Sequence, residues 1–141
     1  MWYNINKIKI VDGYPPNIDA IKIRFPHFDK HKPIFSYGDT IFNPFKGVVT
    51  PDLEHHEKIH SERQGQFPEI WWSKYLTDDQ FRLEEELLAY GEQYKFFKEN
   101  ANNPKLTEWL LDKLSMALSG ELYGNLLSYG EARSKIRRYA I

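Results

Sequence analysis

The chain has 141 residues, an aromatic content of 16%, a formal net charge of -1 and no cysteine. These properties predict one ordered domain over residues 1–141 and exclude disulfides and thiolate metal sites. The nearly balanced charge argues against a nucleic-acid partner, and the basic stretch Arg133–Arg138 is expected to be a solvated helix face. The N-terminus has no apolar run behind a basic start, so we expect no signal peptide and no membrane segment.

The first third of the chain carries strand patterns interrupted by one short helix. Isoleucines at positions 8 and 10 alternate with lysines, as in a strand, and apolar residues recur at helical spacing from Ile18 to Phe25. Residues 34–50 are rich in β-branched and aromatic side chains and are punctuated by glycine and proline. We therefore expect two or three short strands there, in a small antiparallel sheet.

From Thr50 onward the pattern is helical. Thr50 and Pro51 predict the start of a helix that ends near Gly65. Further helices are expected after Pro68, over residues 78–99 behind a capping box at Thr77 and Gln80, over residues 105–118, and over residues 121–139. The sequence thus predicts an α+β fold, in which the small sheet packs on the first of these helices and a helical bundle follows.

The central motif is HEKIH at positions 56–60, which has the pattern HExxH. On a helix, positions i and i+4 lie on one face, so His56 and His60 can bind one metal ion. Glu57 can then act as the general base on a water molecule without being a ligand itself. His55 projects about 100° away from His56 and is expected on the surface.

A catalytic zinc ion needs a third protein ligand, which in a chain without cysteine must be His, Asp or Glu. His27 and His31 lie upstream in a segment flanked by prolines. The acidic run Glu84–Glu86 is the better source, because it lies on a predicted helix. The extended metzincin motif is excluded, since Arg63 and Gln66 stand where it requires Gly and His.

HExxH followed by a glutamate on a later helix resembles the gluzincin-type zinc metallopeptidases. In many of them the third ligand begins an E-x-x-A turn, and in the acidic run only Glu86, followed by Ala89, matches that frame. The resemblance therefore implies Glu86 as the third zinc ligand. In that family an Asp often stands directly after the small residue, whereas this chain has Tyr90 at that position. Tyr90 and Tyr123 are candidates for an oxyanion partner or for support of a ligand.

A closer resemblance covers most of the chain. The strings YGDTIFNP, HEKIHSERQG, WWSKYL, FRLEEELLAYGEQYKF and LSGELYGNLLSYGEA are similar to small metallopeptidases of tailed bacteriophages and prophages. The resemblance implies a minimal zincin that hydrolyses a protein or peptide, is expressed in the cytoplasm of a bacterial host, and associates with phage virion proteins. The substrate is expected to add as a strand at the sheet edge, near residues 47–50.

One alternative from a different class stays open. The main alternative to a peptidase is a virion structural or assembly protein on a zincin scaffold, with a structural or inactive metal site. Access to the metal separates the two functions, because a peptidase needs an open cleft in front of the metal. Neither function requires nucleic acid or a membrane as a partner.

Overall fold

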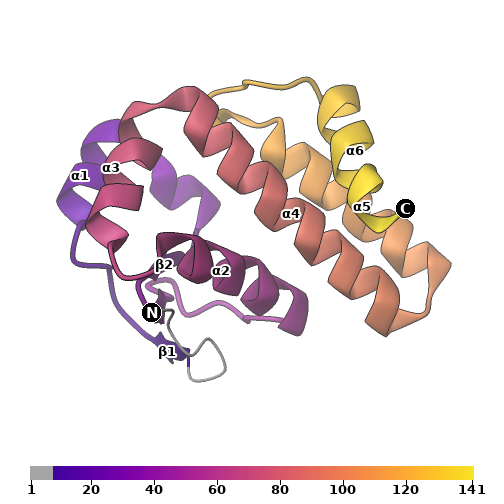
Figure 1. The fold of residues 1–141 in the computed structure, drawn as a ribbon, viewed down its shortest axis with the longest axis horizontal. Helices are drawn as coiled ribbons and strands as arrows, with labels where there is room; N and C mark the ends of the chain where they lie inside the picture. Colours follow the sequence, from indigo (N-terminus) through magenta and orange to yellow (C-terminus); the bar gives the residue numbers. More distant parts are fainter. Residues whose placement is uncertain (1–7) are drawn as a thin grey trace.

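The structure, a computed structural model, describes residues 8–141 (Figure 1). In this part of the chain, a three-stranded sheet is followed by a predominantly helical region, and the α+β class is confirmed. The expectation about an N-terminal leader falls partly on residues 1–7, which lie outside the described residues. Among those that are described, no helix combines the length and the apolar character that crossing a membrane requires.

The sheet is small and mixed. β1 spans Lys9–Val11, β2 spans Phe35–Tyr37 and β3 spans Thr40–Phe42, and the strand order is β1-β3-β2. β2 and β3 form the expected antiparallel hairpin, but β1 pairs parallel to β3, so the expectation of a wholly antiparallel sheet was wrong. The reason is the long connection over residues 12–34, which carries the chain from β1 to β2 without a hairpin turn.

Two short helices fill this connection, α1 (Ile18–Arg24) and the 3-10 helix η2 (Phe28–His31). After β3 the chain has no regular structure until residue 51, so the edge strand expected near residues 47–50 is absent. The outer edge of β2 is covered instead. The backbone oxygen of Ser36 accepts hydrogen bonds from Gln64 at 2.9 Å and from the Trp72 indole at 3.0 Å.

The helical part follows in chain order. Its elements are α2 (Pro51–Gln64), α3 (Pro68–Thr77), α4 (Asp79–Ala101), α5 (Pro104–Leu118), η3 (Glu121–Tyr123), α6 (Tyr129–Arg137) and η4 (Arg138–Ala140). The long helix α4 is central, and α2, α3, α5 and α6 all pack against it (Figure 1). The stretch expected as one helical region after residue 121 is split into three pieces, with α6 in the middle.

The helix ends differ from expectation in two places. The capping box expected at Thr77 is absent, because Thr77 still belongs to α3 and the Asp78 side chain caps α4. Thr50 precedes α2 at the expected position, but its side chain makes no capping hydrogen bond. A capping box occurs later, between Ser128 and Glu131 at the start of α6. Short polar side chains thus cap the N-termini of α4 and α6, although they are not always the residues that the local sequence pattern favoured.

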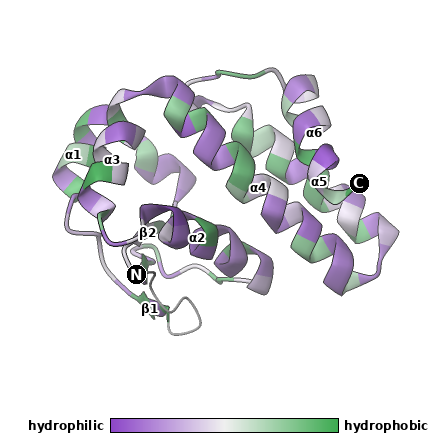
Figure 2. Cartoon of the chain, in the orientation of Figure 1, coloured by the Kyte–Doolittle hydropathy of each residue, from purple (hydrophilic) through white to green (hydrophobic). Residues whose placement is uncertain are grey.

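Two apolar clusters form the core, one joining α4, α5 and α6 and the other joining α1, β2 and α3. α2 contributes to neither. All of its buried residues are polar, and it is drawn largely in the hydrophilic colour (Figure 2): Asp52, His56, Glu57, His60, Ser61 and Gln64. Buried polar groups lower stability unless they are paired, so the partners of this face indicate what α2 is built for.

Candidate metal centre

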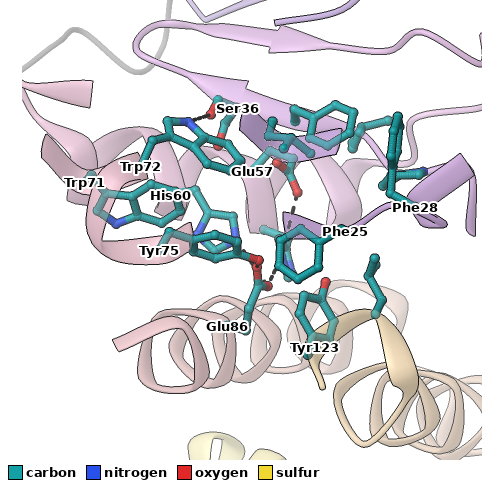
Figure 3. A pocket seen from close by; sticks show the side chains of 16 residues that line it. Phe25, Phe28, Ser36, Glu57, His60, Trp71, Trp72, Tyr75, Glu86 and Tyr123 are labelled. Atoms are coloured by element: carbon teal, nitrogen blue, oxygen red, sulfur yellow. Dashed lines mark hydrogen bonds and ion pairs between the residues drawn. The ribbon is translucent and has the colours of Figure 1, made fainter. Parts of the chain in front are cut away.

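His56 and His60 on α2 meet Glu86 on α4. The Oε1 atom of Glu86 lies 3.2 Å from Nε2 of His56 and 3.2 Å from Nε2 of His60. The three residues are 3%, 4% and 4% exposed, and each offers one ligand atom within 4.8 Å of the others. The structure therefore brings together the three residues expected as ligands, and Figure 3 shows His60 facing Glu86 across the centre.

The helix geometry explains this convergence. One helical turn separates His56 from His60, so both imidazoles leave α2 on the same side. Ala89, one turn beyond Glu86, is fully buried, and its small side chain lets α4 approach α2 closely. The second carboxylate oxygen of Glu86 accepts a hydrogen bond from the hydroxyl of Tyr75 on α3. Oε1 is thus left for the two imidazoles.

A hydrogen-bonded relay behind His56 determines which ring nitrogen faces Glu86. The side-chain nitrogen of Gln93 donates to Asp52 at 2.8 Å, so the amide oxygen of Gln93 remains as an acceptor. That oxygen lies 2.9 Å from Nδ1 of His56, which must therefore carry the proton. In a neutral imidazole, Nε2 then presents a lone pair to Glu86.

The donor set fits a metal ion. Two acceptors 3.2 Å apart, such as His56 Nε2 and Glu86 Oε1, repel unless a proton or a cation lies between them. Tetrahedral zinc with bonds of about 2.0–2.1 Å to nitrogen and oxygen places its ligand atoms about 3.3 Å apart. Both distances from Glu86 to the histidines match that spacing. Two imidazoles and one carboxylate are also ligand types that zinc accepts in catalytic sites.

Glu57 is the remaining carboxylate at the centre. It is 5% exposed, and its Oε2 atom lies 3.7 Å from Nε2 of His56. Burial raises the pKa of Glu57 to about 8, and the nearby charge of Glu86 adds to the increase. Burial alone would also raise the pKa of Glu86. Without a metal, imidazoles that carry a proton toward Glu86 outweigh this effect through their charge and hydrogen bonds, and they hold the pKa of Glu86 below its usual range. The pKa values of these two neighbouring carboxyl groups are thus shifted in opposite directions, a pattern typical of functional sites.

The two tyrosines singled out in the sequence also lie at the centre. Their hydroxyls are 2.9 Å apart, and the ring of Tyr90 packs against His56 with centroids 4.4 Å apart. Burial raises the pKa of both phenols, so both remain protonated. Tyr123 lines the hollow in front of Glu57 (Figure 3). It is the better placed of the two to meet a bound molecule, while Tyr90 supports the His56 ring.

The remaining candidates point elsewhere. Glu85 accepts hydrogen bonds from Arg63 and from the Trp71 indole, and Glu84 is exposed. His55, expected on the surface, is half-buried and stacks on Phe96 of α4, with ring centroids 4.7 Å apart. The upstream histidines are not part of the cluster: His27 is exposed, and His31 pairs with Glu121. Glu86 is therefore the only carboxylate of the acidic run that faces both imidazoles.

Two hollows open at the centre. A small one of about 60 Å³ touches His56, His60, Glu57 and Glu86, and its walls are largely aromatic. A larger one of about 370 Å³ reaches His56 and Glu57 from the outside. The ligand atoms are thus nearly enclosed, while the proposed base is reachable from a surface hollow.

Comparisons with protein-family models, with curated proteins and with solved structures find no match. The interpretation of the centre therefore rests on its own geometry. That geometry adds three residues that the sequence did not single out, Asp52, Gln93 and Tyr75. A spacing signal existed for the first, since Asp52 lies one turn before His56 on the same helix face.

Proposed function

We propose that this chain is a zinc-dependent metalloendopeptidase with a minimal zincin fold. His56, His60 and Glu86 would hold the metal, and Glu57 would be the general base. The observation that carries the proposal is the convergence of two imidazole nitrogens and one carboxylate oxygen beside a second buried carboxylate. A structural metal site has no need of that second carboxylate, whereas hydrolysis needs a base.

On this proposal, the metal and the surrounding side chains have separate roles in hydrolysis. Bound zinc supplies a Lewis acid that acidifies water and polarises a carbonyl group. Glu57 accepts a proton from water and passes it to the leaving amine, for which its raised proton affinity is suited. The phenol of Tyr123 donates to the oxygen on which negative charge develops. Tyr75 holds Glu86, and Gln93 holds His56, so the ligands keep their orientation.

The biological setting follows from the resemblance to small metallopeptidases of tailed phages. On this proposal the chain acts in the cytoplasm of a bacterial host, on a protein or peptide substrate, and associates with phage virion proteins. The covered outer edge of β2 limits how such a substrate binds. Gln64 and Trp72 already occupy the backbone oxygen of Ser36, so a substrate strand pairs with the sheet elsewhere or only after these side chains move.

One observation favours the alternative, a virion structural or assembly protein with a structural or inactive metal site. The ligand residues are at most 4% exposed, and the hollow next to them holds only about 60 Å³. A metal enclosed in this way resembles a structural ion. The surface hollow that reaches Glu57 weighs against this alternative, because it gives a substrate a route to the base.

The first test is metal content. The protein is purified without added metal and analysed for metals per chain, beside a His56→Ala, His60→Ala variant whose folding is checked by circular dichroism. We expect about one zinc ion per chain in the parent and none in the variant. A parent that binds no zinc, even after zinc is offered, would remove the proposal. Zinc without any hydrolysis of a broad peptide library would favour the structural alternative.

A further inference from the structure

Among the described residues, Leu122 in η3 is the one that borders all three hollows near the centre. It lines the inner hollow of about 60 Å³, the outer hollow of about 370 Å³ and a third hollow of about 160 Å³. It also packs against both apolar clusters of the core. Displacement of this one side chain would therefore join spaces that are separate in the closed structure.

The lining of the inner hollow has a polar and an apolar part. Glu57, His60 and the other centre residues form the polar part. Figure 3 shows Phe25 and Phe28 on one side of Glu57 and Trp72 beside His60. We use the name apolar chamber for the apolar part, which is formed by Ile21, Phe25, Phe28, Phe35, Trp72 and Leu122. Apart from the four residues of the centre, none of the described residues that line this hollow has a charged side chain. A charged group placed there would lose its hydration without gaining a partner, whereas an apolar group would gain by burial.

The closed inner hollow, of which the chamber is one part, is too small to hold a large apolar group. A volume of about 60 Å³ holds a few water molecules and not a large side chain. It has to open before anything larger can enter.

The segment that carries Leu122 is suited to opening. η3 has three residues and lies between Gly120 and Gly124, and Gly124 and Asn125 both have positive φ, at +87° and +53°. Among the described residues, two side-chain contacts connect η3 to other elements, in addition to backbone hydrogen bonds within residues 117–125. Glu121 pairs with the exposed His31 at 3.2 Å, and Tyr123 bonds to Tyr90. Exposed ion pairs of this kind stabilise weakly, and short segments between turns commonly act as flaps over active sites.

We propose that the apolar chamber is the subsite for a large apolar side chain of the substrate, and that η3 is a flap whose Leu122 closes it. The inference rests on the proposed peptidase function, because it places the chamber beside the bond to be cleaved. When the flap moves, the chamber joins the outer hollow that reaches Glu57. A substrate side chain then fills the chamber while its backbone passes the base.

The first experiment uses metal-free protein and toluene as the probe, so that it does not depend on zinc. Leu122→Ala removes the side chain that closes the chamber. Leu127→Ala is the matched control, because Leu127 is partly buried in the same connection but lines none of the three hollows. We expect about tenfold tighter toluene binding in Leu122→Ala than in the control, since the open form no longer has to be populated first. The NMR signal of the Trp72 indole should shift, and that of the exposed Trp109 should not.

Equal toluene binding by the two variants, or a shift at Trp109 alone, would overturn the subsite. If Leu122→Ala does not fold, hydrogen exchange provides the decision. Amides of residues 120–125 should exchange through a local opening, about two- to fivefold faster in Glu121→Ala than in the parent. Glu54→Ala, which removes the partly exposed ion pair to Lys58, is the control and should leave these amides unchanged. Exchange only through global unfolding would overturn the flap.

Zinc uptake by the same proteins, measured after zinc is offered, separates the two proposals. Toluene binding in Leu122→Ala together with a parent that takes up no zinc would remove the peptidase and leave an apolar pocket. Zinc uptake without toluene binding would remove the subsite and leave the metal centre.

Discussion

The Nδ1 atom of His56 lies 2.9 Å from the side-chain oxygen of Gln93, and this contact turns the other ring nitrogen toward Glu86. Gln93 is oriented in turn by Asp52, which can only accept a hydrogen bond when ionised. The relay runs from the first turn of α2 to α4 and back to α2. It therefore couples the packing of the two helices to the orientation and tautomer of His56, one of the proposed ligands.

Loss of this relay should weaken metal binding without unfolding the protein. In Gln93→Ala, the His56 ring is free to rotate and to exchange its proton between the two nitrogens. We expect zinc affinity to fall about 10- to 100-fold, as for other partners behind ligands. A competition titration with a chromophoric chelator measures the change, and NMR of the ring nitrogens reports the tautomer. Gln80→Ala, an exposed glutamine of the same helix, is the control, and equal affinities in the two variants would contradict the relay.

The choice of Glu86 among three consecutive glutamates can be tested in the same titration. Glu86→Ala removes the carboxylate that faces both imidazoles, so zinc affinity should fall by at least about 100-fold, the upper end for an outer partner. Glu84→Ala changes an exposed residue two positions earlier and should have no effect. Similar losses in both variants would mean that the acidic run acts through its charge and not as a ligand.

The sequence predicted the centre where its signal is local. Positions i and i+4 on a helix fix the relation of His56 to His60, and helix start and stop residues place that helix correctly. Asp52 and Gln93 were missed although a signal existed. Asp52 is one turn from His56, and Gln93 lies seven residues, or two turns, after Glu86 on the same face. Polar residues that repeat along one helix face indicate a buried polar face, as repeated apolar residues indicate a core face.

Tyr75 and the parallel pairing of β1 could not be read from local patterns. Tyr75 reaches Glu86 because α3 packs against both α2 and α4, and no spacing within α3 specifies that contact. The direction of β1 depends on how a connection of more than twenty residues folds, which alternation within a strand does not encode. Glu86 was predicted as the third ligand only through the resemblance to gluzincins. A contact between two helices has no local sequence signal, so only a known family pattern could indicate it.

The C-terminal segment gives a prediction about stability. A Cβ atom on Gly91 of α4 would lie 2.3 Å from the ring of Tyr139, so this glycine lets η4 pack on the helix. Gly91→Ala should destabilise the protein by about 1–3 kcal/mol, although alanine is normally favoured over glycine within a helix. Gly130→Ala in α6, where nothing lies within 4 Å, should be neutral or stabilising. Urea unfolding measures both, and a stabilised Gly91→Ala variant would show that Tyr139 moves freely.

Glu57→Gln tests the general base directly. The amide keeps the shape of the side chain but cannot accept the proton of water, so hydrolysis of a peptide library should fall about 10²- to 10⁴-fold. Zinc content should remain that of the parent, because Glu57 is not among the three ligand residues. Glu62→Gln, an exposed change on the same helix, should leave both properties intact. Undiminished hydrolysis in Glu57→Gln would assign the base to another residue.

The same variant makes a prediction about pH. Burial raises the pKa of Glu57 from 4.5 to about 8, so the folded metal-free protein retains a proton there that the unfolded chain has released. Between these two values the folded state binds more protons, and the stability that Glu57 contributes falls as pH rises, by at most about 1.4 kcal/mol per pH unit. Glu57→Gln lacks this titration, so its free energy of unfolding relative to the parent should increase from pH 5 to pH 8.

Urea unfolding of both metal-free proteins at several pH values in this range measures the difference. Saturation with zinc provides the control, because a nearby cation favours the ionised carboxylate and should remove most of the pH dependence. Parallel stability curves for the two metal-free proteins would show that Glu57 is ionised at neutral pH even without a metal. Its carboxylate would then be a base that is ready before zinc binds, and the low polarity of the centre would have no part in tuning it.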